Sequence, residues 1–291
     1  MKWLSRWGLS ILFLSLLGLT GCSPGFGLSS QVHSIVVYSR ALNKPMKVDV
    51  YLPPNYDKRI RYPVAYLFHG KAGNANSWMS GDFGLNAVSI DQDATRMIEN
   101  GTLRPVILVS PEMDNSYGLN SSAATEAIAG YNRGQYESYV IDDLVPYVDQ
   151  HYSTIANRSG RYLGGFSMGG FIALHDAFLH PNLFSKVGVM SAALWVGGVP
   201  QELAWLYPTP ALMEARDPIS IAQLHPIQGI RVEVLEGSAD PFLFADRTLD
   251  KTLVRTKVPV IYHEYPGGHD YAFWSSHASE LLSFFAGVPR E

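Results

Sequence analysis

The sequence predicts an α/β fold with a mostly parallel central sheet and helices on both faces of that sheet. Short apolar runs, rich in β-branched and aromatic residues and bounded by turn residues, suit strands that are buried on both faces. These runs are residues 64–68, 106–109, 162–166, 187–190, 232–235 and 260–262. Helical segments alternate with them, at 87–100, 136–151, 170–178, 244–256 and 273–285. Such alternation implies right-handed crossovers and a three-layer sandwich.

The composition fits one large domain. The chain has 291 residues, of which 47% are hydrophobic, and this is ample for a single core. Charged residues make up 16% and the formal net charge is −4, with no basic stripe, so nucleic acid is not expected as a partner. The sequence does not predict an oligomeric state.

Residues 1–21 are predicted to be a signal peptide. Lys2 and Arg6 precede an apolar stretch, residues 7–19, that is too short to span a bilayer comfortably. The Leu-Thr-Gly-Cys of residues 19–22 resembles the lipobox of bacterial lipoproteins, in which the signal is cut before the cysteine and the thiol is lipidated. The alternative is an ordinary secretory signal with an incidental cysteine.

The cysteine count agrees with the lipobox. Cys22 is the only cysteine, so no intramolecular disulfide can form, and it stands where a lipid would be attached. We therefore expect an exported protein that is anchored to a membrane through Cys22. Residues 22–30 would form the lipidated tether, and Ser23 would favour the outer membrane if the source is Gram-negative.

The domain itself is expected to span residues 31–291 and to begin with an antiparallel hairpin. Residues 32–39 and 46–52 read as its strands, and Val48, Val50 and Leu52 alternate with polar residues, as in a sheet with one solvated face.

A G-x-S-x-G motif follows the strand predicted at residues 161–164 and opens a helix predicted to begin near Met168. It reads Gly165-Phe166-Ser167-Met168-Gly169. The strand–turn–helix context is typical of a nucleophile elbow, whose tight turn leaves no room for a Cβ at either glycine. The alternative is a glycine-rich turn with a helix-capping serine. The motif predicts that Ser167 is a nucleophile.

A serine nucleophile needs a base, and His269 is the best candidate. It lies in the glycine-rich loop 266–270 after the strand at 260–262. The chain order of this kind of site is serine, acid, histidine, which excludes His69 although it too follows a strand.

The acid should follow a strand between Ser167 and His269. Asp240 comes directly after the strand at 232–235, and its task would be to orient and stabilise the imidazole. Asp246 is the alternative, but it falls on a predicted helix.

The tetrahedral intermediate needs two backbone N–H donors, which form an oxyanion hole. The first expected donor is Met168, directly after the nucleophile. The second should lie in the loop after the strand at 64–68, where Lys71 is the candidate and Gly70 and Ala72 remain possible.

Together these motifs resemble the esterase D family of α/β-hydrolases, which includes S-formylglutathione hydrolases, feruloyl and acetylxylan esterases, siderophore esterases and mycolyltransferases. The matching segments are residues 48–54, 67–70, 136–139, 143–148, 165–170 and 267–271 with Trp274. The resemblance covers residues 31–291 and places the family's nucleophile, acid and base on Ser167, Asp240 and His269. Its oxyanion donors fall on Met168 and Lys71, although many relatives carry an apolar residue at the second position.

The resemblance implies an esterase or thioesterase that acts on a small-molecule ester or acyl substrate. The alternatives are an acyltransferase of the mycolyltransferase type and a non-catalytic binding protein on the same fold. The sequence contains no H-E-x-x-H motif and no cysteine cluster, and the mechanism needs neither metal nor cofactor.

A long insertion between Ser191 and Arg231 carries the aromatic residues Trp195, Trp205 and Tyr207. Such segments often form lids, so these three side chains are predicted to line an acyl or aryl pocket. The alternative is that they pack onto the domain's own core, in which case the loops 79–86 and 115–131 would set the specificity.

Overall fold

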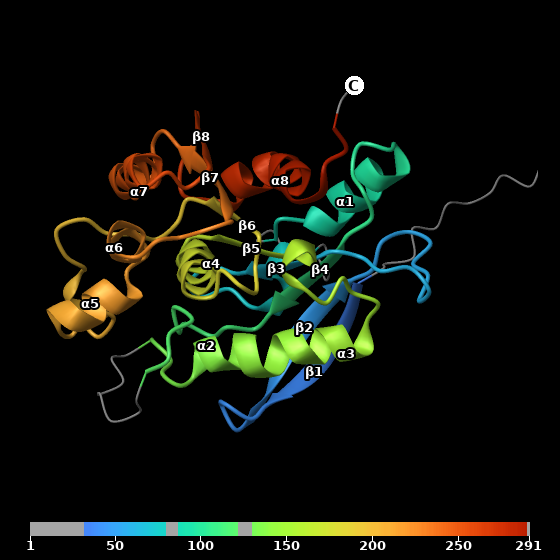
Figure 1. Cartoon of the computed structure of the whole chain (residues 1–291), viewed down its shortest axis with the longest axis horizontal. Helices are drawn as coiled ribbons and strands as arrows, with labels where there is room; N and C mark the ends of the chain where they lie inside the picture. Colours follow the sequence, from blue (N-terminus) through green and yellow to red (C-terminus); the bar gives the residue numbers. More distant parts are fainter. Residues whose placement is uncertain (1–31, 80–86, 122–129, 290–291) are drawn as a thin grey trace, which may run out of the picture. The chain divides into compact units, whose positions relative to one another are not determined.

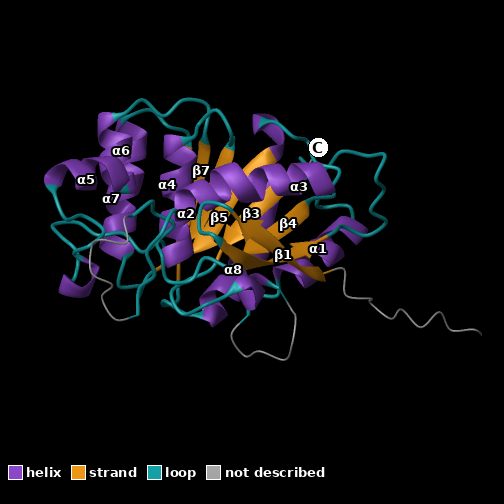
Figure 2. Cartoon of the chain, turned by 90° about the horizontal axis from the view of Figure 1, so that it is seen from below, coloured by secondary structure: helices purple, strands orange, loops and turns teal. Residues whose placement is uncertain are grey.

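The central sheet has the topology that the sequence predicts. In the computed structural model, which describes residues 32–79, 87–121 and 130–289, eight strands form one sheet in the order β1-β2-β4-β3-β5-β6-β7-β8 (Figures 1 and 2). The strands are β1 (Val32–Ser39), β2 (Lys44–Tyr51), β3 (Val64–Phe68), β4 (Ile107–Pro111), β5 (Arg161–Phe166), β6 (Lys186–Met190), β7 (Arg231–Gly237) and β8 (Val260–Tyr265). β1 and β2 form the expected antiparallel hairpin, β2 pairs antiparallel with β4, and all later pairs are parallel.

The helices lie on both sides of the sheet (Figure 1). They are α1 (Ile90–Glu99), α2 (Tyr136–Ser138), α3 (Val145–His151), α4 (Met168–Leu179), α5 (Pro210–Arg216), α6 (Pro218–Leu224), α7 (Leu243–Arg255) and α8 (Tyr271–Ala286). A π-helical segment, Tyr139–Leu144, joins α2 to α3. The sequence predicted one helix for that whole stretch, and it did not predict α5 and α6.

Successive side chains of β3 point to opposite faces of the sheet and contribute to two separate apolar clusters. Val64, Tyr66 and Phe68 belong to the apolar cluster that also contains residues of α3, α4 and α7, whereas Ala65 and Leu67 belong to the separate cluster that contains residues of α1 and α8. All five residues are completely buried, as expected for a central parallel strand covered on both faces. The three-layer prediction is therefore confirmed.

β8 departs from the prediction in its surroundings. It is the edge strand beside β7, and its residues alternate between half-buried and exposed instead of being buried on both faces. Within the described residues, the edge position leaves one side of β8 without a partner strand, and its only neighbour in the sheet is β7.

The predicted signal peptide (1–21), the tether (22–30) and Cys22 lie outside the described residues. Within the ranges that the structure describes, no helix is both long enough and apolar enough to cross a bilayer.

Candidate active site

Ser167 stands at a sharp turn between β5 and α4. Its backbone has φ 54° and ψ −122°, a strained conformation for a residue with a side chain. The neighbouring glycines are required by contact: a Cβ on Gly165 would lie 2.1 Å from the backbone of Gly169, and one on Gly169 would lie 1.9 Å from the carbonyl oxygen of Phe68. The turn therefore has the geometry of a nucleophile elbow and holds the Ser167 hydroxyl at the carboxyl end of the sheet.

Three side chains from different strand ends meet in one hydrogen-bonded row. The Ser167 hydroxyl oxygen lies 2.8 Å from His269 Nε2, and His269 Nδ1 lies 2.8 Å from a carboxylate oxygen of Asp240. The structure thus brings together the predicted nucleophile, base and acid, with the imidazole bound on both nitrogens.

Asp240 is held for this contact by its own turn. Its side chain is fully buried, and its second oxygen accepts the N–H of Phe242 at 2.8 Å. Burial acts to raise the pKa of Asp240, but hydrogen bonds from His269 and Phe242 outweigh it and lower this pKa below its usual value. The carboxylate is therefore the stable form beside the imidazole.

Asp246, the alternative acid, does not contact His269. It lies on α7, completely buried, and burial raises its pKa above the usual value. Its position on a helix rather than directly after β7 separates it from the imidazole, as the sequence argument anticipated.

The loops after β7 and β8 are joined to each other, and this fixes His269. The N–H of Ala239 donates to the carbonyl of Gly267 at 2.9 Å. Gly267 has a φ of 153°, and a Cβ there would lie 2.5 Å from the Phe273 ring. The imidazole lies edge-on between the rings of Phe242 and Trp274, each 5.1 Å away.

The first expected oxyanion donor, Met168, is the first residue of α4. Its N–H has no partner within the helix, because the first N–H groups of a helix never have one. The Ser167 carbonyl accepts the N–H groups of Ala193, Gly170 and Phe171, at 2.9, 3.0 and 3.2 Å, and the trans peptide points the Met168 N–H away from these donors. The Met168 N–H is therefore available beside the Ser167 hydroxyl.

The loop of the second expected donor, Lys71, touches the elbow. A Cβ on Gly70 would lie 3.2 Å from the Ser167 Cβ. The Gly70 carbonyl accepts the N–H of Gly73 at 3.0 Å and lies 2.8 Å from His69 Nδ1. Since a trans peptide points its C=O and N–H in opposite directions, these contacts fix the direction of the Lys71 N–H.

His69 is a buried anchor for that loop. Its side chain is fully buried. Nε2 lies 3.0 Å from the backbone nitrogen of Met113 and 3.2 Å from a carboxylate oxygen of Glu112, and Nδ1 lies 2.8 Å from the Gly70 carbonyl oxygen. The imidazole therefore ties the loop after β3 to the loop after β4. Sequence reasoning excluded His69 as a base but missed this role.

A cavity of about 410 Å³ opens beside Ser167. Aromatic rings dominate its wall, and the polar groups are few. The lining residues are Gly70, Lys71, Tyr117, Tyr131, Phe166, Ser167, Ala193, Trp195, Pro200, Glu202, Leu203, Phe242, His269, Tyr271 and Trp274. The Lys71 ammonium donates to the Tyr131 hydroxyl at 2.8 Å and lies 4.5 Å from the centre of that ring.

The three aromatic residues predicted to line the pocket divide into two groups. Trp195 lies in the wall, whereas Trp205 and Tyr207 do not, and for these two the prediction is corrected. Trp205 is buried behind the wall, with its ring 5.9 Å from Tyr131, and Tyr207 turns away to donate to Asp217 at 3.2 Å. The cause is burial within the insertion itself, which sequence alone does not reveal.

The loops 79–86 and 115–131 were the alternative source of specificity. Most of the first loop (residues 80–86) and the middle of the second (residues 122–129) lie outside the described residues. Tyr117 and Tyr131, at the two ends of the second loop, do line the cavity. Sequence reasoning also missed Glu202, Phe242 and Tyr271, which reach the cavity only through the tertiary fold.

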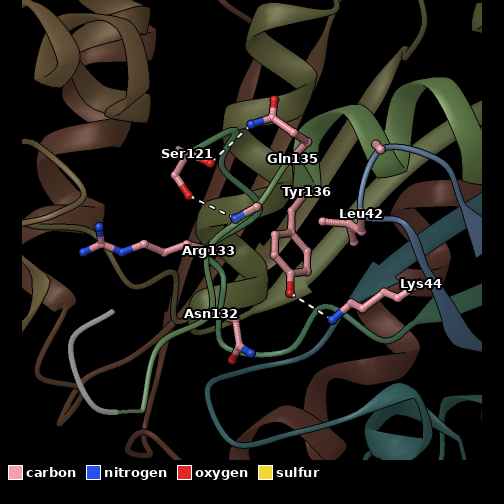
Figure 3. A pocket seen from close by; sticks show the side chains of 9 residues that line it. Leu42, Lys44, Ser121, Asn132, Arg133, Gln135 and Tyr136 are labelled. Atoms are coloured by element: carbon pink, nitrogen blue, oxygen red, sulfur yellow. Dashed lines mark hydrogen bonds between the residues drawn. The ribbon is translucent and has the colours of Figure 1, made fainter. Parts of the chain in front are cut away.

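A second cavity of about 320 Å³ lies between the β1–β2 turn, Ser121 and residues 132–136 (Figure 3). Its polar groups bind one another: Gln135 donates to the Ser121 carbonyl at 3.2 Å, the Gly134 N–H donates to the Ser121 hydroxyl at 3.2 Å, and Lys44 donates to the Tyr136 hydroxyl at 3.3 Å. Its described lining contains no histidine or cysteine beside its one serine.

No group of three or more histidine, cysteine, aspartate or glutamate side chains in residues 32–79, 87–121 and 130–289 is arranged to hold a metal ion.

Comparison with known proteins places the chain in a family. A family model described as "Putative esterase" matches residues 39–284. The endo-1,4-beta-xylanase/feruloyl esterase of Xylanibacter ruminicola is 28% identical over 236 residues, which are 76% of this chain but only 30% of that protein. The acetyl esterase of Caldicellulosiruptor saccharolyticus is 22% identical over 283 residues, covering 88% of this chain and 98% of the relative.

Solved structures agree with the fold. A ferulic acid esterase aligns with a TM-score of 0.73 at 23% identity, covering 88% of this chain and 97% of its own. An S-formylglutathione hydrolase from Agrobacterium tumefaciens aligns with a TM-score of 0.71 at 18% identity, covering 87% and 93%. With the family model spanning most of the domain, the chain belongs to the "Putative esterase" family and has the α/β-hydrolase fold.

Proposed function

We propose that the chain is an exported serine esterase that hydrolyses carboxylic esters or thioesters through an acyl-enzyme on Ser167. The observation that carries this proposal is the continuous row from Ser167 through His269 to Asp240, with both contacts at 2.8 Å, at the wall of an aromatic cavity. Membership of an esterase family supports the same reaction class.

In the first half of the reaction, the Ser167 oxygen attacks the ester carbonyl carbon while its proton passes to His269 Nε2. The carbonyl π electrons move to the oxygen, and the N–H groups of Met168 and Lys71 would stabilise that negative charge. The imidazolium is stabilised by Asp240. When the carbonyl reforms, the bond to the leaving group breaks and the imidazolium proton goes to the departing alcohol or thiol.

In the second half, water replaces the alcohol. His269 takes a proton from the water as its oxygen attacks the acyl carbon, and a second tetrahedral oxyanion forms in the same place. Its collapse releases the carboxylic acid and returns the proton to the Ser167 oxygen. Asp240 remains a carboxylate throughout, in keeping with its lowered pKa.

The cavity favours an aromatic or extended apolar acyl group. Trp195, Phe242 and Trp274 present ring surfaces beside the nucleophile, and burying such surfaces stabilises an apolar ligand by roughly 25 cal/mol per Å². Relatives named as feruloyl or ferulic acid esterases act on an aromatic acyl group, which agrees with this wall.

We also propose that the protein is exported and is anchored to a membrane by a lipid on Cys22. The lipobox-like residues 19–22 support this. Mass spectrometry of the mature N-terminus should find a diacylglyceryl-modified cysteine, and Cys22→Ser should leave the protein unprocessed or in the soluble fraction. An unmodified N-terminus on the wild-type protein would contradict this assignment.

The reaction itself is tested by labelling and turnover. A fluorophosphonate probe should modify Ser167, and p-nitrophenyl esters of increasing chain length should be hydrolysed. Methanol added as a competing acceptor distinguishes hydrolysis from acyl transfer, because a transferase would form mostly methyl ester. If the folded protein is neither labelled by the probe nor able to hydrolyse these esters, the esterase proposal is refuted and only a binding role remains for this site.

A further inference from the structure

The cavity beside Ser167 contains one carboxylate among its described lining residues, that of Glu202. It stands on a 3₁₀-helix, Gln201–Leu203, inside the insertion that supplies Trp195 to the same wall. Besides burial, Glu202 helps to raise the pKa of Tyr117, which lines the same cavity. Tyr117 is three ring contacts away from the base: its ring lies 5.8 Å from that of Trp195, which lies 5.6 Å from Phe242, which lies 5.1 Å from His269. Glu202 therefore neighbours a part of the wall that lies away from the catalytic residues.

The position of Glu202 is fixed by its backbone. The N–H of Leu203 donates to the Pro200 carbonyl at 2.8 Å, and the N–H of Ala204 donates to the Gln201 carbonyl at 3.1 Å. The side chain of Leu203 is buried in the core. These bonds hold the backbone of Glu202 at the edge of the cavity that its side chain lines.

Lys71 and Glu202, the two side chains of opposite charge in the described lining of this cavity, differ in whether they already have a hydrogen-bond partner. The Lys71 ammonium is bound to the hydroxyl and the ring of Tyr131. The Glu202 side chain is exposed, and no hydrogen bond or ion pair joins it to any other residue of the described chain. Its oxygens therefore keep their full capacity to accept hydrogen bonds from a ligand.

The charge of Glu202 reaches the wall of the cavity. The pKa of Tyr117 is raised, first by burial and further by the neighbouring Tyr131 and by Glu202. Tyr117 lines the same cavity, with its ring 5.8 Å from that of Trp195. A ligand lying against these rings is thus within the field of the carboxylate.

We propose that Glu202 is a specificity residue, which selects substrates that carry a hydroxyl group at the end remote from the ester and rejects substrates that carry a negative charge there. An ionised carboxylate only accepts hydrogen bonds, so a hydroxyl satisfies it, an ether oxygen does not, and a second carboxylate is repelled. This inference rests on the proposed esterase function and names the substrate class of the same site.

The test uses three methyl esters of one acid, 3-phenylpropanoic acid, that differ only at the para position of the ring: hydroxyl, methoxy and carboxylate. We expect the wild type to prefer hydroxyl to methoxy by about threefold to tenfold in kcat/KM and to hydrolyse the carboxylate ester least. In Glu202→Lys the hydroxyl preference should fall toward one, and the carboxylate ester should gain at least tenfold relative to the methoxy ester.

The matched control is Glu214→Lys. Glu214 lies on α5 of the same insertion, is exposed, and does not line the cavity. It should leave all three relative rates unchanged, so a general effect of net charge would show in both variants. Ratios within one variant are compared, so a loss of overall activity does not affect the reading.

Two failures can be told apart. If Glu202→Lys retains the wild-type ratios while p-nitrophenyl acetate is still hydrolysed by the wild type, the role of Glu202 is overturned and the esterase remains. If the wild type neither hydrolyses p-nitrophenyl acetate nor reacts with a fluorophosphonate, the proposed function falls, and this inference falls with it.

Discussion

Two cavities of the described chain, beside Ser167 and beside Ser121, are similar in size, at about 410 and 320 Å³, but differ in what their polar groups do. Around Ser121, donors and acceptors of the cavity wall bind one another (Figure 3). In the cavity beside Ser167, by contrast, the Ser167 hydroxyl is hydrogen-bonded to His269, the base that would take its proton. The same hydroxyl faces the cavity in which a substrate carbonyl would lie. An active site of this kind needs a nucleophile that is hydrogen-bonded to its base and backbone N–H donors that are left for the substrate. The described lining of the cavity beside Ser121 contains no histidine that could serve as the base.

The sharpest way to break this comparison is to remove each serine in turn. Ser167→Ala should fold normally and lose about 10⁴-fold or more in kcat, because the acyl-enzyme can no longer form. Ser121→Ala removes one hydrogen bond and should cost about 1 kcal/mol of stability with kcat unchanged. Turnover of p-nitrophenyl acetate and thermal unfolding of both variants provide the measurement. Near-normal turnover by folded Ser167→Ala would refute the whole assignment.

The next comparison is between the two buried aspartates of the β7–α7 region. Asp240→Asn should lower kcat by about 10³- to 10⁴-fold, because an amide holds the imidazole in the wrong tautomer. Asp246→Asn should lower it by less than about tenfold, since burial already raises the pKa of Asp246 and the side chain does not contact His269. A reversed ranking would move the acid to Asp246 and leave the fold intact.

A third comparison tests whether His69 positions the loop that contains Lys71, the second expected oxyanion donor. His69→Leu removes the contacts of the imidazole with Gly70, Met113 and Glu112 and should lower kcat by about 100-fold, with little change in KM. His69→Asn keeps a donor near the Nδ1 position and should recover about tenfold of that loss. If kcat followed only the melting temperature of the two variants, His69 would be a packing residue and no more.

The smallest expected effect concerns the two tryptophans of the insertion. Trp195→Ala, in the cavity wall, should change the kcat/KM ratio between short and long or aromatic acyl esters by about tenfold. Trp205→Ala, behind the wall, should cost about 3 kcal/mol of stability and leave that ratio nearly unchanged. A panel of esters of different acyl chain length, together with thermal unfolding, checks both variants. If the kcat/KM ratio changed only in Trp205→Ala, the assignment of Trp195 rather than Trp205 to the cavity wall would be wrong.

The relation of Ser167, Asp240 and His269 could be predicted because local rules sufficed. Each residue follows a recognisable strand, parallel strands bring their carboxyl ends to one edge, and the chain order in this fold is fixed. The wall of the cavity could not be predicted in the same way. Tyr117, Phe242 and Glu202 come from three separate segments that only the tertiary fold brings to one cavity. An aromatic residue also has the same sequence pattern in a cavity wall and in a core.

Some structure in the insertion did leave a signal that the sequence analysis did not use. α5 and α6 each begin with a capping residue followed by proline, Thr209-Pro210 and Asp217-Pro218. Side-chain caps and a proline at the first helical position are start signals. These signals predict two short helices after Tyr207, but they do not show how the insertion packs, so the burial of Trp205 could not be predicted from them.

The burial of α4 has a consequence for how the site is lost on unfolding. Every residue from 168 to 178 is buried, so the helix that follows the nucleophile has no face in solvent. Its central amide hydrogens should exchange with deuterium only when the whole domain opens, whereas amides near the exposed Glu202 should exchange through small local openings. The nucleophile is therefore tied to the cooperative unit of the fold, and the substrate-facing rim can fluctuate without disturbing it.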